Sequence, residues 1–172
     1  KAGQRFPDIV QMKDITPTIL ELMGMKTNIK FDGRSLVPLM AGKKRVAEPE
    51  MYITECTWMR KHGWRTPEWK LIHALEPDLH YKPEIELYNI IKDPGENDNV
   101  AADNPEVVQM LEARMRKWIV KREKETGRKN PMYTNLNWHG YGVQFETSQQ
   151  AYDTMRIGSS KAAEDLQARL KG

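Results

Sequence analysis

The sequence is organised around one long segment with the pattern of an amphipathic helix, between residues 104 and 127. Asp103 or Asn104 can cap its first turn, Pro105 suits the first helical position, and Gly127 suits the end. Apolar side chains recur along one stripe of this segment: Val107, Val108, Met110, Leu111, Met115, Trp118 and Ile119. Such a stripe predicts that the helix lies on a hydrophobic surface supplied by another element.

Three segments before this helix are rich in β-branched and aromatic residues, which favour strands. They span residues 51–56, 69–73 and 86–90. After the third, the sequence Asp93-Pro94-Gly95-Glu96 has the residue types of a type II turn. We predict an α+β fold, in which a small antiparallel β-sheet of three to four strands packs against the one long amphipathic helix.

A shorter helix is predicted near the start of the chain, within residues 14–24. Thr16 can serve as its N-cap, Pro17 suits the first turn, and Gly24 closes it. One face is apolar and needs a hydrophobic partner, because so short a helix is not stable alone: Ile19, Leu20 and Met23. Residues 26–50 follow as a connector that contains a one-turn helix.

Beyond residue 127 the periodicity weakens. Residues 130–142 form an aromatic segment punctuated by Gly, which indicates a loop or an arm. A terminal helix with a narrow apolar stripe is predicted to begin at Ser159 or Ser160. We therefore expect three parts, namely residues 1–48, 49–127 and 128–172.

The charge distribution argues against two classes of partner. The 172 residues include 27 Lys or Arg and 24 Asp or Glu, so the net charge is only +3, and the two signs are interleaved. This pattern predicts no nucleic-acid partner. No apolar run approaches the roughly 18 residues that cross a bilayer, so no membrane partner is predicted either. We expect Lys1 to be a position inside a longer chain, and the location to be cytoplasmic or periplasmic.

Few residues have the arrangement of a catalytic or metal site. The four histidines, one of which is His62, lack the spacing of a metal-binding helix face. Cys56 would need a base such as His62 to act as a nucleophile, and we expect it instead to be a buried structural thiol. Asp153, Ser159 and Ser160 could complete a hydrolase arrangement in name only, because the Gly-x-Ser-x-Gly elbow is absent.

Residues 58–67 contain the densest mixture of cationic and aromatic side chains, and they join two of the predicted strands. Arginine forks bind oxyanions and tryptophan offers a stacking surface, so one interpretation is a functional loop. The other is an ordinary charged hairpin whose tryptophans cover the sheet edge. Composition does not choose between them.

The order of four segments resembles the C-terminal part of the arylsulfatase family. These segments are residues 14–24, 32–39, 65–72 and 86–101. The resemblance extends from Pro7 to Val120. It implies a large α/β domain of the alkaline-phosphatase-like superfamily, of which the 14–24 helix is the end, followed by the small domain predicted above.

The resemblance also implies that the catalytic machinery lies upstream. In this family the nucleophile is a formylglycine, made in a Cys/Ser-x-Pro/Ala-x-Arg motif, and calcium is held by Asp and Asn residues. Cys56 and Arg60 have the motif's spacing, but Trp58 stands where Pro or Ala is needed, so we assign Cys56 no catalytic role. We expect this chain to bind neither metal nor cofactor.

What the resemblance implies for function is the C-terminal portion of a sulfatase, which hydrolyses sulfate esters when complete and is inactive alone. Family members sometimes bring substrate-contacting residues from the region of residues 60–65, so His62 and Arg65 are the candidates for substrate binding. The expected partner is the missing N-terminal sulfatase domain. Exposed apolar surface or the C-terminal arm could also support self-association.

Two other interpretations stay open at this point. The chain could be a stand-alone binding or assembly module that grips a partner through residues 133–141 and the terminal helix. It could also be a fragment of a related phosphonate or phosphodiester hydrolase, because the nucleophile that distinguishes those enzymes is not in the sequence.

Overall fold

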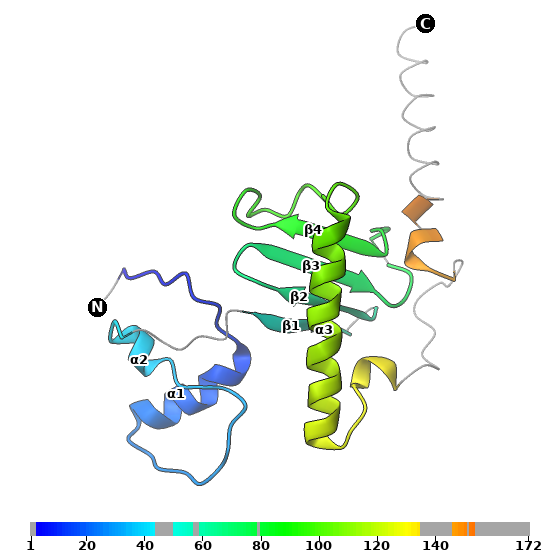
Figure 1. Cartoon of the computed structure of the whole chain (residues 1–172). Coiled ribbons are helices and arrows are strands. Elements are labelled where there is room, and N and C mark those ends of the chain that lie inside the picture. Colours follow the sequence, from blue (N-terminus) through cyan, green and yellow to red (C-terminus); the bar gives the residue numbers. More distant parts are fainter. Residues whose placement is uncertain are drawn as a thin grey trace, which may run out of the picture. The chain divides into compact units, whose positions relative to one another are not determined.

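The computed structural model describes residues 3–43, 50–56, 59–78, 80–134, 146–150 and 152–153. The chain divides into two compact units, which we call the N-terminal unit (residues 1–50) and the sheet unit (residues 51–172). Each is described by itself (Figure 1). No helix in these ranges is both long and apolar enough to cross a membrane.

The N-terminal unit contains three short helical elements, η1 (Met12–Asp14), α1 (Ile15–Leu22) and α2 (Val37–Met40). The predicted helix and the one-turn helix of the connector are therefore confirmed. The predicted cap at Thr16 is wrong, because the turn of η1 leads directly into α1 and Thr16 lies inside the helix. Pro17 still falls in the first turn, where no backbone N–H is required of it.

Two of the sequence segments that resemble sulfatases fold onto each other in this unit. The buried Asp14 carboxylate accepts a hydrogen bond from the backbone N–H of Arg34 at 2.9 Å. The Thr18 hydroxyl donates to the Asp14 carbonyl at 2.6 Å and accepts from the backbone N–H of Leu36 at 2.8 Å. A Cβ at Gly33 would lie 1.9 Å from the carbonyl oxygen that precedes Asp14, so only glycine fits this contact.

The sheet unit is a four-stranded antiparallel sheet with one long helix on one face (Figure 1). Its strands lie in sequence order: β1 (Met51–Glu55), β2 (Lys61–Arg65), β3 (Trp69–Ala74) and β4 (Ile85–Asn89). The helix is α3 (Pro105–Thr126), and Gly127 ends it with a φ of 66°. The predicted α+β architecture and both ends of the long helix are confirmed.

The hydrophobic core lies between the sheet and α3. The sheet contributes Trp64, Leu71 and Leu87 to it, and α3 contributes Leu111, Met115 and Ile119. Burial of these side chains is the main force that holds the helix on the sheet. The predicted apolar stripe is correct except for Met110, which is 41% exposed.

Strand β2 was not among the three predicted strands. The sequence interpretation treated it as part of a connecting loop or hairpin, whereas it is an inner strand that pairs with both β1 and β3. Its sequence contains Gly63 and no β-branched residue, so the usual signal is absent. The glycine is required, because a Cβ there would lie 2.0 Å from the Leu71 carbonyl oxygen.

The chain reverses after β4 as predicted, but the predicted turn type is wrong. The backbone N–H of Glu96 donates to the Asp93 carbonyl at 3.2 Å, and the positive φ, 55°, belongs to Glu96 rather than to Gly95. A type II turn would need it at Gly95. The Asp93 carboxylate accepts hydrogen bonds from the backbone N–H groups of Asn97 (2.6 Å) and Asp98 (2.9 Å), which holds the chain beyond the turn.

The two edges of the sheet differ. The side chain of Asn99 accepts from the backbone N–H of Leu87 at 2.9 Å and donates to the carbonyl of Ile85 at 3.1 Å, and the N–H of Val100 donates to the Leu87 carbonyl at 2.9 Å. These bonds occupy the outer edge of β4. Strand β1 forms the other edge.

After α3 the chain returns to the sheet through η2 (Pro131–Tyr133), whose Met132 is buried. We call residues 128–134 the return segment. Arg60 fastens it by donating from Nη1 to the Met132 carbonyl at 3.1 Å. The predicted terminal helix and most of the predicted arm lie outside the described residues.

Candidate functional site

His62 lies in β2 on the face that α3 covers, and only 4% of it is exposed. Its Nδ1 lies 3.1 Å from the Tyr52 hydroxyl and 3.4 Å from the Tyr133 hydroxyl. Burial lowers the pKa of His62 to about 4, and the positive charges of His73 and Arg116 act in the same direction. The imidazole is therefore neutral at pH 7, held between two phenols.

Tyr52 connects this histidine to the return segment. Its hydroxyl accepts a hydrogen bond from Nδ2 of Asn130 at 2.9 Å, and its ring stacks on Trp118 of α3 with a centroid distance of 4.7 Å. Burial raises the pKa of Tyr52 to about 12. The phenol therefore stays protonated and serves as a fixed polar contact.

His73 is the neighbour of His62 across the β2–β3 pair, with 5.6 Å between the ring centroids. Its Nδ1 lies 3.0 Å from Oε1 of Glu112 on α3, and its Nε2 lies 3.3 Å from Oε1 of Glu84. Two carboxylates thus face this ring, whereas two phenols face His62. The two histidines therefore differ in the groups that face them.

The opposite face of the sheet carries buried ionic side chains. Lys61 pairs with Asp78 and, at 3.3 Å, with Glu86, which also accepts a hydrogen bond from the Tyr88 hydroxyl. Burial raises the pKa of Tyr88, and Glu86 raises it further. Each of these groups has its partner within the sheet unit, so the loss of one partner would leave a buried charge unpaired.

Arg65, the second predicted substrate-binding residue, is in a different situation. Its Nη1 is buried and has no hydrogen-bond partner in the described part of the chain. Burial lowers its pKa, whereas the charge of Glu96 opposes that shift. Since side chains alternate along a strand, Arg65 and His62 point to opposite faces of β2. The structure does not bring them together.

Cys56 is exposed, so the expectation of a buried thiol is wrong. It directly follows the edge strand β1. Its Sγ lies 3.2 Å from Sδ of Met132, and no hydrogen bond joins it to His62 in the described ranges. Within these ranges no group of three or more His, Cys, Asp or Glu residues could hold a metal ion, so none receives a metal-binding role.

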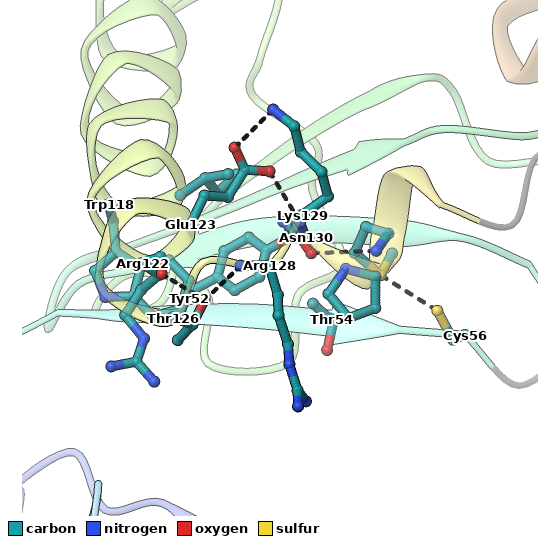
Figure 2. Close-up of a pocket in the computed structure, with 13 residues that line it drawn as sticks. Tyr52, Thr54, Cys56, Trp118, Arg122, Glu123, Thr126, Arg128, Lys129 and Asn130 are labelled. Atoms are coloured by element: carbon teal, nitrogen blue, oxygen red, sulfur yellow. Dashed lines mark hydrogen bonds and ion pairs between the residues drawn. The ribbon is translucent and has the colours of Figure 1, made fainter.

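A pocket of about 470 Å³ lies beside Tyr52, on the side of the return segment (Figure 2). Three elements form it: the edge strand β1, the last two turns of α3, and the return segment. Tyr52 belongs both to its wall and to the surroundings of His62, and Trp118, which stacks on Tyr52, also lines it. Three cations line it as well: Arg122, Arg128 and Lys129.

The sequence interpretation did not single out the residues of this pocket. Trp118, Arg122 and Thr126 follow one another at four-residue spacing on α3, so helical periodicity could have grouped them. Tyr52 and Asn130 meet across 78 residues of sequence. No local pattern predicts that contact.

Comparison with known proteins gives consistent matches. Residues 1–125 match the family model described as N-sulphoglucosamine sulphohydrolase, C-terminal. Arylsulfatase K of Rattus norvegicus is 28% identical over 129 residues, which are 69% of this chain and 22% of that protein. A Delta 4,5-hexuronate-2-O-sulfatase of Bacteroides thetaiotaomicron is 31% identical over 98 residues, which are 52% of this chain and 19% of that protein.

A solved structure of similar fold is that of a protein in complex with its substrate D-glucosamine-2-N,6-O-disulfate. The TM-score is 0.53 at 23% identity, over 70% of this chain and 25% of the other. The chain thus spans about a quarter or less of the length of each of these proteins.

Proposed function

Because the chain belongs to the family of C-terminal domains described as N-sulphoglucosamine sulphohydrolase, C-terminal, we propose that it completes a sulfatase whose catalytic groups lie in an upstream domain. The complete protein hydrolyses sulfate esters, and this chain alone does not. The observation that carries the proposal is the family match over residues 1–125, in a chain that spans only 22% of arylsulfatase K. The formylglycine and calcium of the family belong to that upstream domain in this proposal.

The surface of α1 supports an upstream partner. The residues of η1 and α1 that are buried are polar, Asp14 and Thr18, whereas the apolar Ile19 and Leu22 are 49% and 61% exposed. Exposed apolar side chains gathered on one short helix are typical of a docking surface. An upstream catalytic domain is the occupant we propose for it.

Arg65 supports a contribution to the substrate cleft. A buried guanidinium nitrogen without a hydrogen-bond partner is costly, and an oxyanion such as a sulfate ester is the ligand that a guanidinium binds best. We assign the substrate-binding role to Arg65. His62 faces α3 and acts on the same region only through the packing of the sheet.

The test is to express the reading frame that contains this chain from its own start codon, beside the 172-residue chain, and to assay both with 4-methylumbelliferyl sulfate. We expect the longer protein to release sulfate and the chain alone to release none. Release of product from a phosphodiester but not from the sulfate ester would refute the proposal. So would a start codon immediately before the Lys1 codon.

The docking surface has its own test. Ile19→Asp with Leu22→Asp should leave the melting temperature of the 172-residue chain almost unchanged, because both side chains are exposed, but should destabilise the longer protein. Glu21→Lys, an exposed position of the same helix, is the control. Equal melting temperatures of the longer protein with and without the two substitutions would exclude α1 as the contact.

The role of Arg65 is tested in the longer protein. Arg65→Gln should raise KM for the sulfate ester by roughly tenfold with a smaller effect on kcat, because one charged hydrogen bond to the substrate is lost. Lys70→Gln, which removes a neighbouring cation already paired with Glu96, is the matched control. A change in unfolding temperature with unchanged KM would mean that Arg65 binds protein rather than substrate.

A further inference from the structure

The pocket of the sheet unit has a preformed aromatic wall. Tyr52 and Trp118 stack with an interplanar angle of 28°, and Asn130 fixes the Tyr52 hydroxyl from the return segment. Trp118 also meets Trp64 of the core edge-on, with 6.3 Å between centroids. Rings held from both sides offer a surface whose ordering costs little when a ligand binds. The volume of about 470 Å³ lies in the usual range of small-molecule pockets.

The charged groups of the pocket favour an anionic ligand. Its carboxylate, that of Glu123, is already occupied by the backbone N–H of Asn130 at 2.8 Å and by Nζ of Lys129 at 3.3 Å. The Asn130 hydrogen bond lowers the pKa of Glu123, so this carboxylate stays ionised and held in place. It is turned towards Lys129, and the other two cations of the lining are Arg122 and Arg128.

Both arginines of the pocket are at least partly exposed to solvent. Arg128 makes no ion pair with the residues that the structure describes, and Arg122 pairs with Glu125 at 3.2 Å in a solvent-exposed contact. Exposed ion pairs contribute little and exchange readily. Figure 2 shows both guanidinium groups extending to the same side of the pocket, away from the pair of Glu123 and Lys129. An anionic group bound on that side would face guanidinium groups, which bind carboxylate and sulfate oxygens through paired N–H donors.

We propose that this pocket binds an acidic saccharide unit. The sulfate or carboxylate group of the sugar pairs with Arg122 and Arg128, and the apolar face of the ring lies against Tyr52 and Trp118. Thr54, Thr126 and Asn130 also line the pocket, and their polar side chains would face the hydroxyl groups of the sugar. The preference for an anion rests on the geometry above. The choice of a saccharide rests on the proposed sulfatase function and on the name of the Bacteroides thetaiotaomicron relative, a Delta 4,5-hexuronate-2-O-sulfatase.

The pocket would therefore hold part of a polymeric substrate in addition to the part that meets Arg65. It belongs entirely to the sheet unit, so binding does not require the upstream domain. A second contact on the same chain raises the effective concentration of the substrate near the enzyme. Short and long substrates should consequently differ in KM in the complete protein.

The test uses the full 172-residue chain and a heparin-derived tetrasaccharide as the probe. Binding is measured by calorimetry and by ¹H–¹⁵N spectra. In these spectra the indole N–H signal of Trp118 should shift as the probe is added. Arg122→Gln with Arg128→Gln should weaken binding roughly tenfold or more, since two charged hydrogen-bonding groups are lost. Lys92→Gln with Arg114→Gln removes the same charge at exposed positions outside the pocket and should change the affinity by less than about twofold.

Three results would overturn the proposal: no shift of the Trp118 signal, an equal loss of affinity in the control variant, or hexaglutamate binding as tightly as the tetrasaccharide. The last would mean that the pocket binds acidic polymers of another class. None of these measurements involves hydrolysis. A longer protein that lacks sulfatase activity would refute the proposed function while leaving the binding result intact, and an active protein whose pocket does not bind would refute only the pocket.

Discussion

Lowering the pH from 7 to 4 should remove a defined part of the stability of the sheet unit, because His62 must gain a proton. The imidazole is 4% exposed, and its pKa is lowered from 6.5 to about 4 in the folded chain. The unfolded chain therefore binds this proton first as the pH falls. The contribution of His62 to stability is complete above pH 6.5 and is lost progressively down to pH 4.

The magnitude follows from the size of the shift. Each pKa unit corresponds to about 1.4 kcal/mol, so the shift from 6.5 to about 4 represents about 3 kcal/mol of unfolding free energy. Between these pH values the slope attributable to His62 approaches about 1.4 kcal/mol per pH unit. The neighbouring His73 and Arg116 do not reduce this cost, because both lower the pKa of His62 in the same direction as burial does.

The assay is urea unfolding of the 172-residue chain at intervals between pH 4 and pH 7.5, repeated on His62→Gln. Carboxylates also titrate near pH 4, so the informative quantity is the difference between the two pH profiles. His80→Gln, at an exposed histidine, is the control and should follow the original profile. Even where His62→Gln lowers stability at pH 7, its flatter profile between pH 6.5 and pH 4 remains measurable. Parallel profiles for the original chain and His62→Gln would refute the reasoning.

Three further substitutions test the packing. Leu111→Ala removes a fully buried core side chain and should lower the free energy of unfolding by about 2–5 kcal/mol, measured by chemical denaturation. Met110→Ala, at a side chain of the same helix that is 41% exposed, should lower it by less than about 0.5 kcal/mol. Equal losses would contradict the assigned core face. Gly63→Ala should prevent the pairing of β2 with β3, because the new Cβ would lie 2.0 Å from the Leu71 carbonyl oxygen. A native far-ultraviolet circular dichroism spectrum with an unchanged melting temperature would show instead that the strand accommodates the methyl group. Asn130→Ala should lower the free energy of unfolding by about 1–3 kcal/mol, because its hydrogen bonds to Tyr52 and Met132 are lost. It should also expose the Tyr52 hydroxyl and raise the rate of Tyr52 iodination. An unaltered rate would mean that other contacts hold the return segment.

The elements that the sequence predicted correctly are those whose signals are local. Helix α3 begins at Pro105 and ends before Gly127 because these residues suit the first turn and a left-handed terminus, whatever surrounds them. Strand β3 likewise follows from its own apolar and aromatic residues. The reversal after β4 was predicted from Pro94 and Gly95, but its type was not, because the Asp93 carboxylate binds backbone N–H groups beyond the turn.

Strand β2 and the pocket could not be predicted in the same way, because tertiary contacts define them. Gly63 weakens the strand signal yet is the residue that lets β2 approach β3. His62 was selected as a member of a loop, and the structure instead buries it in a strand beneath Tyr133, 71 residues away. The pocket wall likewise requires Tyr52 and Trp118 to stack from two different elements.

The N-terminal unit shows what helical periodicity does and does not determine. The pattern of α1 indicates an apolar face that needs a partner, and the structure leaves Ile19 and Leu22 on the surface. Inside the unit, α1 is held instead by polar contacts of Asp14 and Thr18 with the segment that contains Gly33. A helix that packs internally through polar groups and presents its apolar side outward leaves that apolar surface in contact with water. That arrangement supports the proposed upstream domain as its partner.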